Sequence, residues 1–503
     1  MTVTPVLIVG AGPTGLVLAL WLTKLGVRVR IVDREAEPGT TSRALAVQAR
    51  TLELYRQVGL ADAVVASGVE VDGLGFWVKG RLAARVSLRR IGEGMSPYAF
   101  VFVFPQDAHE RLLIERLASL GVSVERSTEL VDFTQEENGI RATLRCPDGS
   151  RETFEAAYLA GCDGASSTVR NGIGEGFPGG TYTGRFYVAD VEASGPAVDR
   201  RVQIDLDESD FLILFPLKDE GRVRLVGVLR ELPGGAAAEP TFEDVGQRAI
   251  TNLGLRVARV HWFSTYRVHH RVASHFRDRR VFLLGDAAHV HSPVGGQGMN
   301  TGIGDAVNLA WKLAAVLGGG ARDDLLSTYE LERIGFARRL VSTTDRIFAF
   351  VTKRGPFVRF IRTRVVPLLF RLGPVRRFQF RVVSQTAIEY RASPLSSGSA
   401  GSVRGGDRLP WIAGGPEDNF APLGSLRWQA HVYGDVRRET ADACAALGLE
   451  LHRFAWSEPA RRAGLARDAL YLVRPDGYVA LADRGADAGR LRRYFKERGL
   501  GPR

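Results

Sequence analysis

Cysteine is scarce in this chain of 503 residues. The three cysteines, Cys146, Cys162 and Cys444, form no CxxC pair and show no paired spacing. A disulfide framework is therefore not expected, and the usage fits a reducing compartment. No apolar run reaches the roughly 18 residues that a membrane span needs. The first residues also lack the basic region and cleavage site of a signal peptide, so we expect a cytoplasmic protein.

Signatures of several other protein classes are missing as well. Without zinc-finger spacing, an RNP signature or a basic zipper, the net charge of +11 does not indicate a nucleic-acid partner. That charge would instead attract anionic cofactors. No GxSxG elbow supports a serine hydrolase. The histidines that cluster at 269, 270, 275, 289 and 291 lack ligand spacing and a carboxylate pattern, so no metal site is expected.

A complete dinucleotide-binding unit opens the chain. An apolar strand at Pro5–Val9 leads into the GAGPTG loop, a helical pattern follows at Leu16–Leu25, and a second strand at Val27–Val32 ends in an acid. This context makes the GxGxxG motif informative, because the glycines allow a tight turn and let a pyrophosphate reach the helix N-terminus. This acid, Asp33, lies where it could accept hydrogen bonds from the hydroxyls of a ribose. The candidate contacts are Gly10, Gly12, Pro13, Thr14, Gly15, Asp33 and Arg34.

The chain holds a single such fingerprint. A protein that binds two dinucleotides permanently often has two such fingerprints. If one dinucleotide occupies this unit, a nicotinamide cofactor is expected to dock only transiently.

A second glycine loop lies far along the chain. The short apolar run Val281–Leu284 ends in Gly285-Asp286, and the loop PVGGQG leads into a helical pattern at Met299–Val316. Backbone approaches a flat ligand closely only where Cβ is absent. A helix N-terminus presents free N–H groups to an anion or an electron-rich carbonyl. This stretch therefore predicts one wall of a cofactor site.

A third motif lies between these two. The strand pattern beginning at Tyr158 runs into Asp163-Gly164, and a helix start with Ser167 and Arg170 follows. An Asp-Gly pair alone is only a turn signal. The whole pattern of strand, GCDG, serine and arginine carries more information.

In order and spacing, the three motifs resemble those of the single-component FAD-dependent aromatic monooxygenases, the 4-hydroxybenzoate hydroxylase group. The layout is most similar to phenol hydroxylases and bacterial aromatic-polyketide hydroxylases, and the resemblance covers most of residues 1–390. Ser292 departs from the pattern, since a second proline is common there. The resemblance implies FAD as cofactor, NADPH or NADH as transient co-substrate, and O₂.

The implied fold class is α/β, with a Rossmann-like FAD-binding domain of the 4-hydroxybenzoate hydroxylase type at 1–176 and 277–390. An antiparallel, substrate-binding sheet is expected at 177–276, with 72–104 contributing in part. Its predicted strands are Tyr187–Ala193, Arg201–Asp205, Phe211–Pro216 and Val223–Leu229. Residues 391–503 resemble the thioredoxin-like tail of such hydroxylases without the redox CxxC, and Ser393–Gly406 reads as a linker or loop.

The resemblance also implies a mechanism: hydroxylation of a bulky phenolic or polyketide-type ring through a flavin C4a-hydroperoxide. The chain must then stabilise the reduced flavin, exclude water and hold the ring. Asp286 would hold the ribityl chain, and the N–H groups after the glycine loop would face the flavin N1–C2=O edge. The further residues carried over are Arg43, Gln106, Leu130, Asp163, Arg170, Pro293, Gly296, Gly298, Met299 and Asn300.

Some alternatives stay open on the sequence. Phe211, Ile213 and Phe215 could form a substrate wall or simply fill a core. The same flavin chemistry also serves Baeyer–Villiger oxygenation, and a flavin-bound protein without turnover is a further alternative. The basic, apolar stretch 346–390 could lie on a membrane surface, although prolines divide it and packing against the FAD domain explains it equally well. No membrane insertion is expected, and a homodimer is compatible with the resemblance.

Overall fold

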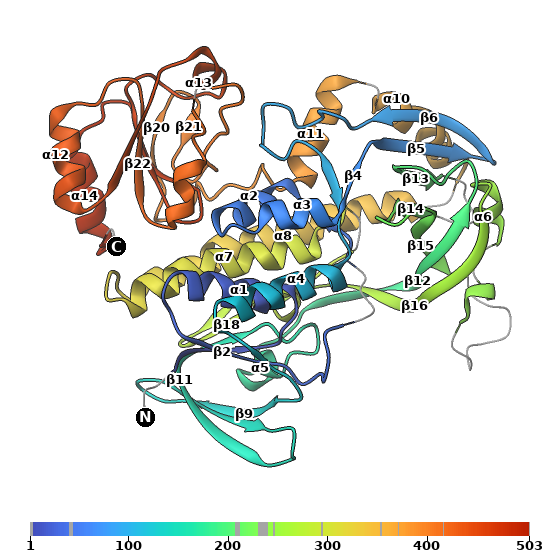
Figure 1. The fold of residues 1–503 in the computed structure, drawn as a ribbon, viewed down its shortest axis with the longest axis horizontal. Coiled ribbons are helices and arrows are strands. Elements are labelled where there is room, and N and C mark those ends of the chain that lie inside the picture. The colour runs from blue at the N-terminus through green and yellow to red at the C-terminus, as the bar shows by residue number, and fades with distance from the viewer. Residues whose placement is uncertain are drawn as a thin grey trace.

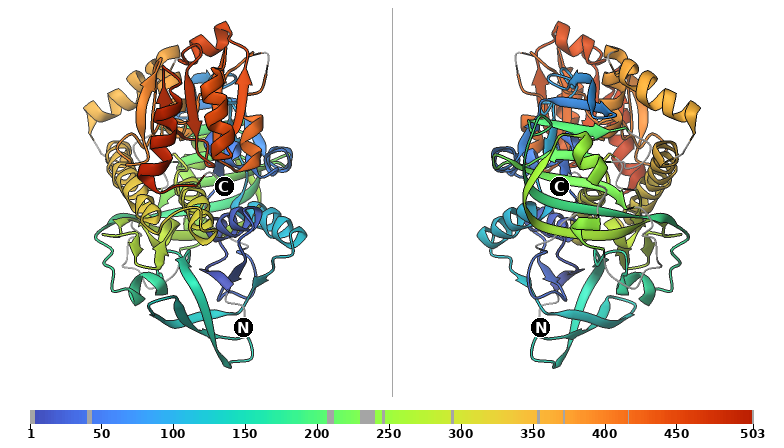
Figure 2. Two further views of the ribbon diagram at one scale, coloured as in Figure 1. Left: turned by 90° about the vertical axis from the view of Figure 1, so that its left-hand side faces the viewer. Right: turned by 90° about the vertical axis from the view of Figure 1, so that its right-hand side faces the viewer.

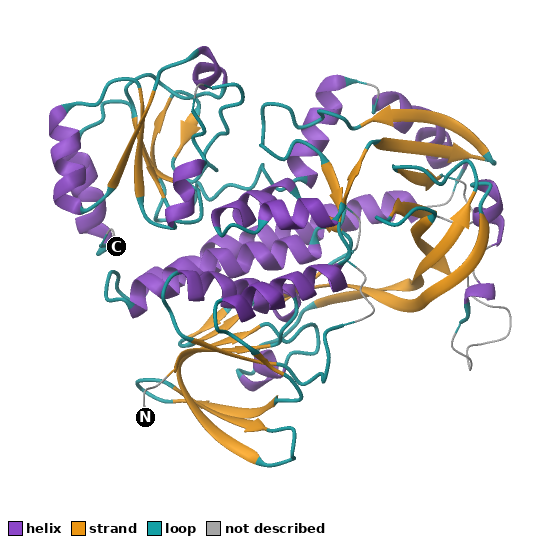
Figure 3. Cartoon of the chain, in the orientation of Figure 1, coloured by secondary structure: helices purple, strands orange, loops and turns teal. Residues whose placement is uncertain are grey.

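The computed structural model describes residues 4–39, 44–206, 212–229, 240–244, 247–292, 295–352, 355–370, 372–415 and 417–501. The described residues form three large sheets, one small sheet and the helices between them (Figures 1 and 3). No helix in this part of the chain is long and apolar enough to cross a membrane.

The first sheet holds the three motifs. Its centre is parallel: β1 lies between β11 and β2, and β18 pairs with β11 on the other side. Since the carboxyl ends of parallel strands share one edge, the loops after β1, β11 and β18 meet there. In sheet order the strands are β17 (Arg277–Asp278), β18 (Val281–Leu283), β11 (Arg151–Gly161), β1 (Thr4–Val9), β2 (Val29–Val32) and β8 (Val124–Glu125), with β9 (Glu129–Gln135) and β10 (Ile140–Arg145) branching from β11.

Helices cover this sheet on the side towards the centre of the molecule (Figure 1). The first of them, α1, packs between α4 and α7. Its middle residues are all buried, which explains why the run is apolar all round rather than amphipathic. The helices of this part are α1 (Pro13–Lys24), α2 (Ala49–Gln57), α3 (Ala61–Ser67), α4 (Gln106–Ser119), α5 (Thr168–Gly172), α7 (Gly298–Leu317) and α8 (Asp324–Thr352).

The second sheet curves away from the first and is largely antiparallel (Figure 1). Its strands β5 and β6 come from the N-terminal third of the chain, where the sequence predicted a partial contribution. The long strand β16 was not predicted, because its half-exposed, arginine-rich residues show no clean alternation. In order the strands are β19 (His289–Val290), β16 (Arg256–Val272), β12 (Gly179–Ser194), β15 (Arg222–Leu229), β14 (Leu212–Pro216), β13 (Arg201–Asp205), β5 (Gly73–Val78) and β6 (Arg81–Ser87).

Two smaller groups of elements complete this part of the fold. A three-stranded sheet packs against the second sheet, and a short helix, α6, also packs on the second sheet. The elements are β3 (Ala46–Val47), β7 (Val101–Val103), β4 (Val69–Val71) and α6 (Gln247–Asn252).

The third sheet belongs to the C-terminal part of the chain. A β-α-β unit, an antiparallel hairpin and a final helix follow one another. The prediction of a linker at Ser393–Gly406 was wrong, because this stretch forms a hairpin whose first strand pairs in parallel with β25. The elements are β20 (Ser397–Ala400), β21 (Val403–Arg404), β22 (Gln429–Tyr433), α12 (Arg438–Leu447), β23 (Glu450–Phe454), α13 (Glu458–Arg462), β24 (Leu470–Val473), β25 (Val479–Asp483) and α14 (Ala488–Arg498).

Short helices fill the stretch before this last sheet. They are α9 (Pro356–Phe360), a π-helical turn (Ile361–Val365), α10 (Val366–Leu369) and α11 (Gly373–Val383).

Candidate functional site

The site begins where β1 turns into α1. Gly10 has φ +101° and donates its N–H to the carbonyl of Val32 at 2.8 Å. A Cβ on Gly10 would overlap with the carbonyl oxygen of Cys162, whereas a Cβ on Gly12 would meet nothing within 4 Å. The floor of the loop is therefore closed by the third motif, and space remains in front of the helix N-terminus. Free N–H groups and the helix dipole favour an anion in that space.

Asp33 lies at the edge of this space. One carboxylate oxygen accepts from the N–H of Ala11 at 2.6 Å, and the other accepts from the N–H of Glu35 at 2.8 Å. The guanidinium of Arg126 lies 3.8 Å away. These contacts fix the carboxylate beside the glycine loop, where the sequence predicted a ribose ligand.

The Gly285-Asp286 turn adjoins the same helix. Gly285 has φ +58°, and a Cβ there would lie 2.6 Å from the hydroxyl of Thr14. Asp286 follows in an exposed position. The first and second glycine motifs, some 270 residues apart, are thus in direct contact.

Helix α7 starts beside this turn, and the amide of Asn300 anchors it. Its oxygen accepts from the N–H of Gln48 at 2.8 Å and from the hydroxyl of Thr51 at 2.7 Å. Its nitrogen donates to the carbonyls of Ala46 and Gly296 at 2.8 and 2.9 Å. The side chain of Asn300 therefore fixes the loop around the helix start. Its N–H group and the two before it precede the first intrahelical bond, which leaves them for a ligand.

The third motif joins the other two through side chains. Asp163 accepts from the hydroxyl of Ser167 at 2.6 Å and from the N–H of Val169 at 3.1 Å, and burial raises its pKa. Arg170 donates to the carbonyl of Ala287 at 2.9 Å and stacks on Phe177, with its guanidinium carbon 4.0 Å from the ring centre. In this arrangement Arg170 holds the motifs together.

The structure describes most of the remaining predicted cofactor residues. Gln106 is the first residue of α4 and donates to the carboxylate of Glu110 at 2.7 Å. The side chain of Leu130 is buried in the core of the first sheet, and Met299 packs on that core. Arg34 is exposed and pairs with Glu35. Arg43 and Pro293 lie outside the described residues.

The predicted substrate wall is partly described. Phe211 lies outside the described residues, whereas Ile213 and Phe215 on β14 are half-buried. Both pack on an apolar cluster that includes Leu45 and Val103, next to the small sheet. Leu212 and Leu214 point the other way into the core of the second sheet, as the period of a strand requires.

His291 faces the start of α7. Its Nδ1 lies 2.8 Å from the carbonyl of Ser292, and its buried Nε2 has no hydrogen-bond partner among the described residues. Burial lowers its pKa to about 4. A ring that donates from Nδ1 and stays neutral presents an acceptor at Nε2, 3.8 Å from the position of a Cβ on Gly298.

A buried carboxylate that the sequence analysis missed lies behind the glycine loop. Asp305 accepts from the N–H of Gly285 at 3.0 Å, lies 2.7 Å from Nε2 of His289 and pairs with Arg333 at 2.5 Å. Although burial opposes it, Arg333 and His289 hold the pKa of Asp305 below its ordinary value. His289, on strand β19, is thus a hydrogen-bonded histidine of the second sheet. No group of metal-ligating side chains appears in the described part of the chain.

A second buried ion network joins α8 to the third sheet. Glu332 on α8 pairs with Lys312 at 2.9 Å and with Arg474 at 2.7 Å, and all three side chains are buried. Arg474 also contacts Asp476, and Arg50 of α2 donates to the carbonyl of Asp476 at 2.6 Å. Only tertiary packing brings these charges together, so local sequence patterns give no sign of them.

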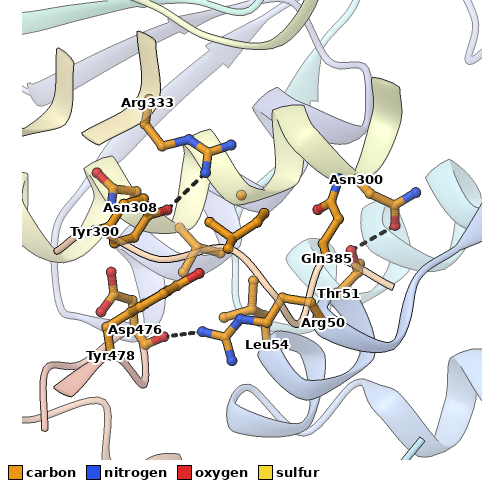
Figure 4. A pocket seen from close by; sticks show the side chains of 13 residues that line it. Arg50, Thr51, Leu54, Asn300, Asn308, Arg333, Gln385, Tyr390, Asp476 and Tyr478 are labelled. Carbon is orange, nitrogen blue, oxygen red and sulfur yellow. Dashed lines mark hydrogen bonds between the residues drawn. The ribbon is translucent and has the colours of Figure 1, made fainter. Parts of the chain in front are cut away.

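A small cavity lies inside this junction, between α2, α7 and the third sheet (Figure 4). Arg50, Asn300, Arg333, Tyr390 and Tyr478 are among its lining residues. Its volume of about 20 Å³ has room for one ordered water but not for an aromatic ring. It is therefore distinct from any substrate pocket.

The residues around α1 and α7 fit a dinucleotide flavin. Open space in front of Gly12 suits a pyrophosphate, Asp33 suits a ribose, and the N–H groups at the start of α7 suit an electron-rich ring edge. The model of the FAD binding domain family matches residues 3–344. The chain belongs to this family. The match confirms FAD as the cofactor that the sequence predicted.

Known proteins extend this assignment. The 6-methylpretetramide 4-monooxygenase of Streptomyces rimosus is 39% identical over 410 residues, which are 80% of this chain and 72% of that protein. The solved structure of OxyS anhydrotetracycline hydroxylase from Streptomyces rimosus has a TM-score of 0.79 at 29% identity and covers 99% of both chains. The flavin-dependent monooxygenase PieE, solved with FAD and substrate, has a TM-score of 0.81 at 25% identity and covers 98% of both. The similarity to FAD-dependent aromatic monooxygenases and the mixed α/β class are thereby confirmed.

Proposed function

We propose that this member of the family hydroxylates a bulky phenolic or polyketide-type aromatic compound with NAD(P)H and O₂. One atom of O₂ enters the ring, the other leaves as water, and NAD(P)H supplies two electrons. The observation that carries the proposal is the close approach of Thr14, in the first turn of α1, to Gly285 and to Gly302 of α7, which brings the starts of the two helices to one open edge. The names of the similar proteins support the class of substrate.

The division of roles among the residues follows from their chemistry. Bound FAD supplies the electrons that activate O₂. The N–H groups around Gly12 would donate hydrogen bonds to the pyrophosphate and stabilise its negative charge, and Asp33 would accept hydrogen bonds from the ribose hydroxyls. Asp286 would hold the ribityl chain. The N–H groups of residues 298–300 would stabilise negative charge that develops on the flavin edge, because fixed dipoles need no reorganisation.

The aromatic substrate would lie between the start of α7 and the second sheet. Ile213 and Phe215 support this placement, since both lie half-buried on the face of β14 that turns towards the small sheet. We further propose that the three large sheets mark three domains with the boundaries predicted from the sequence. The third domain would then be structural, because it has no CxxC pair and buried ion pairs occupy its contact with α8.

The test is an assay of the purified protein. It should contain bound FAD, and a bulky phenolic polyketide should accelerate NADPH or NADH oxidation with matching O₂ uptake. The product should gain one oxygen atom on an intact ring, whereas an oxygen inserted beside a ring carbonyl would indicate Baeyer–Villiger chemistry. Protein without flavin absorbance, or flavin that neither nicotinamide nucleotide reduces, would rule the proposal out.

A further inference from the structure

Exposed apolar side chains gather in one segment of this protein, residues 355–383. Of the nine large apolar side chains exposed on the described residues, seven lie in this segment, with exposed fractions between 43% and 73%. Scattered exposed apolar residues are normal, but a contiguous group indicates an interaction surface. The seven are Phe357, Phe360, Leu368, Leu369, Leu372, Phe378 and Val382.

The positive charge of the chain is concentrated in the stretch of sequence that contains this segment. Residues 346–388 contain nine arginines, one lysine and no acidic residue, a net charge of +10, whereas the whole chain carries +11. All other residues together therefore carry only +1. Three of these arginines, Arg364, Arg377 and Arg381, are exposed among the apolar side chains. An anionic flavin site elsewhere in the fold does not explain this concentration.

The inner side of the segment is attached to the body of the protein. Phe370 packs on Phe76 of the second sheet, with ring centres 5.7 Å apart, and Phe380 is buried beneath Gly92. Arg376 donates to the carbonyl of Ser87 at 3.2 Å. The exposed residues therefore belong to an outer side held in place by these contacts. The helices of this segment stand at the outer edge of the molecule in both views of Figure 2.

We propose that this outer side binds the surface of an anionic lipid membrane, an interaction beyond the oxygenation reaction. Phenylalanine and leucine enter the boundary between headgroups and acyl chains, while arginines meet anionic headgroups. Such binding needs no spanning helix and no continuous helical face, so several short helices can share it. A second copy of the chain fits less well, because two-fold pairing of this side would bring Arg364, Arg377 and Arg381 of one copy close to the same arginines of the other.

Vesicle co-sedimentation of the holoenzyme tests the proposal. Vesicles of phosphatidylcholine with an equal part of phosphatidylglycerol should retain the protein, and vesicles of phosphatidylcholine alone should not. High salt should release it, because salt screens the arginines. The double variants Phe357→Ser/Phe360→Ser and Arg377→Gln/Arg381→Gln should each weaken binding by about tenfold or more. The matched control Arg437→Gln/Arg438→Gln removes two exposed arginines from the third sheet's side and should bind as the wild type does.

The variants should keep their FAD content and thermal midpoint, since the changed side chains are exposed. Failure of the wild type to bind anionic vesicles would overturn the proposal. A dimer in sedimentation velocity that the phenylalanine variant dissolves, without vesicle binding, would assign the surface to a second copy instead. Equal loss of vesicle binding in the control variant would show that net charge alone is responsible, and would overturn the assignment to this segment.

Discussion

Two regions of this protein are built on opposite principles. The edge formed by the starts of α1 and α7 relies on main-chain N–H groups and on glycines, with acids at its rim. The junction of α8 with the third sheet relies on side chains, where Glu332, Arg474 and Lys312 satisfy one another without solvent. The first region leaves its donors for a ligand, and the second leaves none of these three without a partner. A binding site can thus be distinguished from a structural junction by whether its hydrogen-bonding groups still lack partners within the protein.

Asp305 connects the two regions. It accepts from Gly285 in the open loop and pairs with Arg333, which also donates to Tyr390 at 2.9 Å beside the third sheet. Breaking either region should therefore have a different signature: loss of stability at the junction and loss of cofactor at the open edge.

The largest effect is expected at the junction. Glu332→Ala would leave Arg474 and Lys312 as buried charges with one partner fewer, which typically costs about 3–5 kcal/mol of unfolding free energy. Urea unfolding of the protein, followed by tryptophan fluorescence, measures this loss. The control Glu458→Ala removes the exposed partner of Arg461 and should leave the unfolding midpoint unchanged. Equal midpoints for the two variants would mean that the buried network contributes no stability.

Two glycine variants at the open edge should distinguish an effect on protein stability from an effect on FAD affinity. Gly10→Ala should destabilise the protein by about 2–3 kcal/mol, because its backbone is left-handed and a Cβ would overlap with Cys162. Gly12→Ala should keep the thermal midpoint of the apoprotein, since its Cβ meets no protein atom, but should weaken FAD binding. Differential scanning calorimetry and FAD titration check the two effects. A stable Gly10→Ala protein with normal FAD affinity would contradict this account of the loop.

Much of the open edge could be predicted from the sequence, because its signals are local. A strand, a glycine loop and a helix succeed one another within thirty residues, and α7 begins within one residue of the prediction. The role of Asp305 could not be predicted, because only the tertiary packing brings its partners Gly285, His289 and Arg333 next to it. The hairpin of β20 and β21 was missed for the same reason: serine and glycine resemble a linker until pairing with β25 is known.

Low pH should reduce the free energy of unfolding, because buried histidines of the folded protein resist protonation. Burial lowers the pKa of His431 on β22 to about 3, below the value of about 6.5 in an unfolded chain. Between these values the unfolded state binds more protons, so stability present above pH 6.5 is lost as the pH falls. The loss for His431 is about 2 kcal/mol at pH 5. Thermal midpoints at pH 7 and pH 5 should therefore differ less in His431→Gln than in the wild type.

His109 on α4 provides a second case. Its pKa is also lowered to about 3 by burial, and its ring lies 2.7 Å from the hydroxyl of Tyr55. The thermal midpoints at pH 7 and pH 5 should therefore also differ less in His109→Gln than in the wild type. Equal differences in the wild type and in this variant would show that the buried ring of His109 is not the cause.

The central claim is that the open edge of α1 and α7 is the FAD site, and titration of the apoprotein with FAD tests it most directly. The wild type should bind one FAD per chain. Asp286→Ala should bind FAD about tenfold more weakly, corresponding to about 1.4 kcal/mol, with the thermal midpoint of the apoprotein unchanged because Asp286 is exposed. A wild type that binds no FAD, or equal dissociation constants for the two proteins, would contradict the claim.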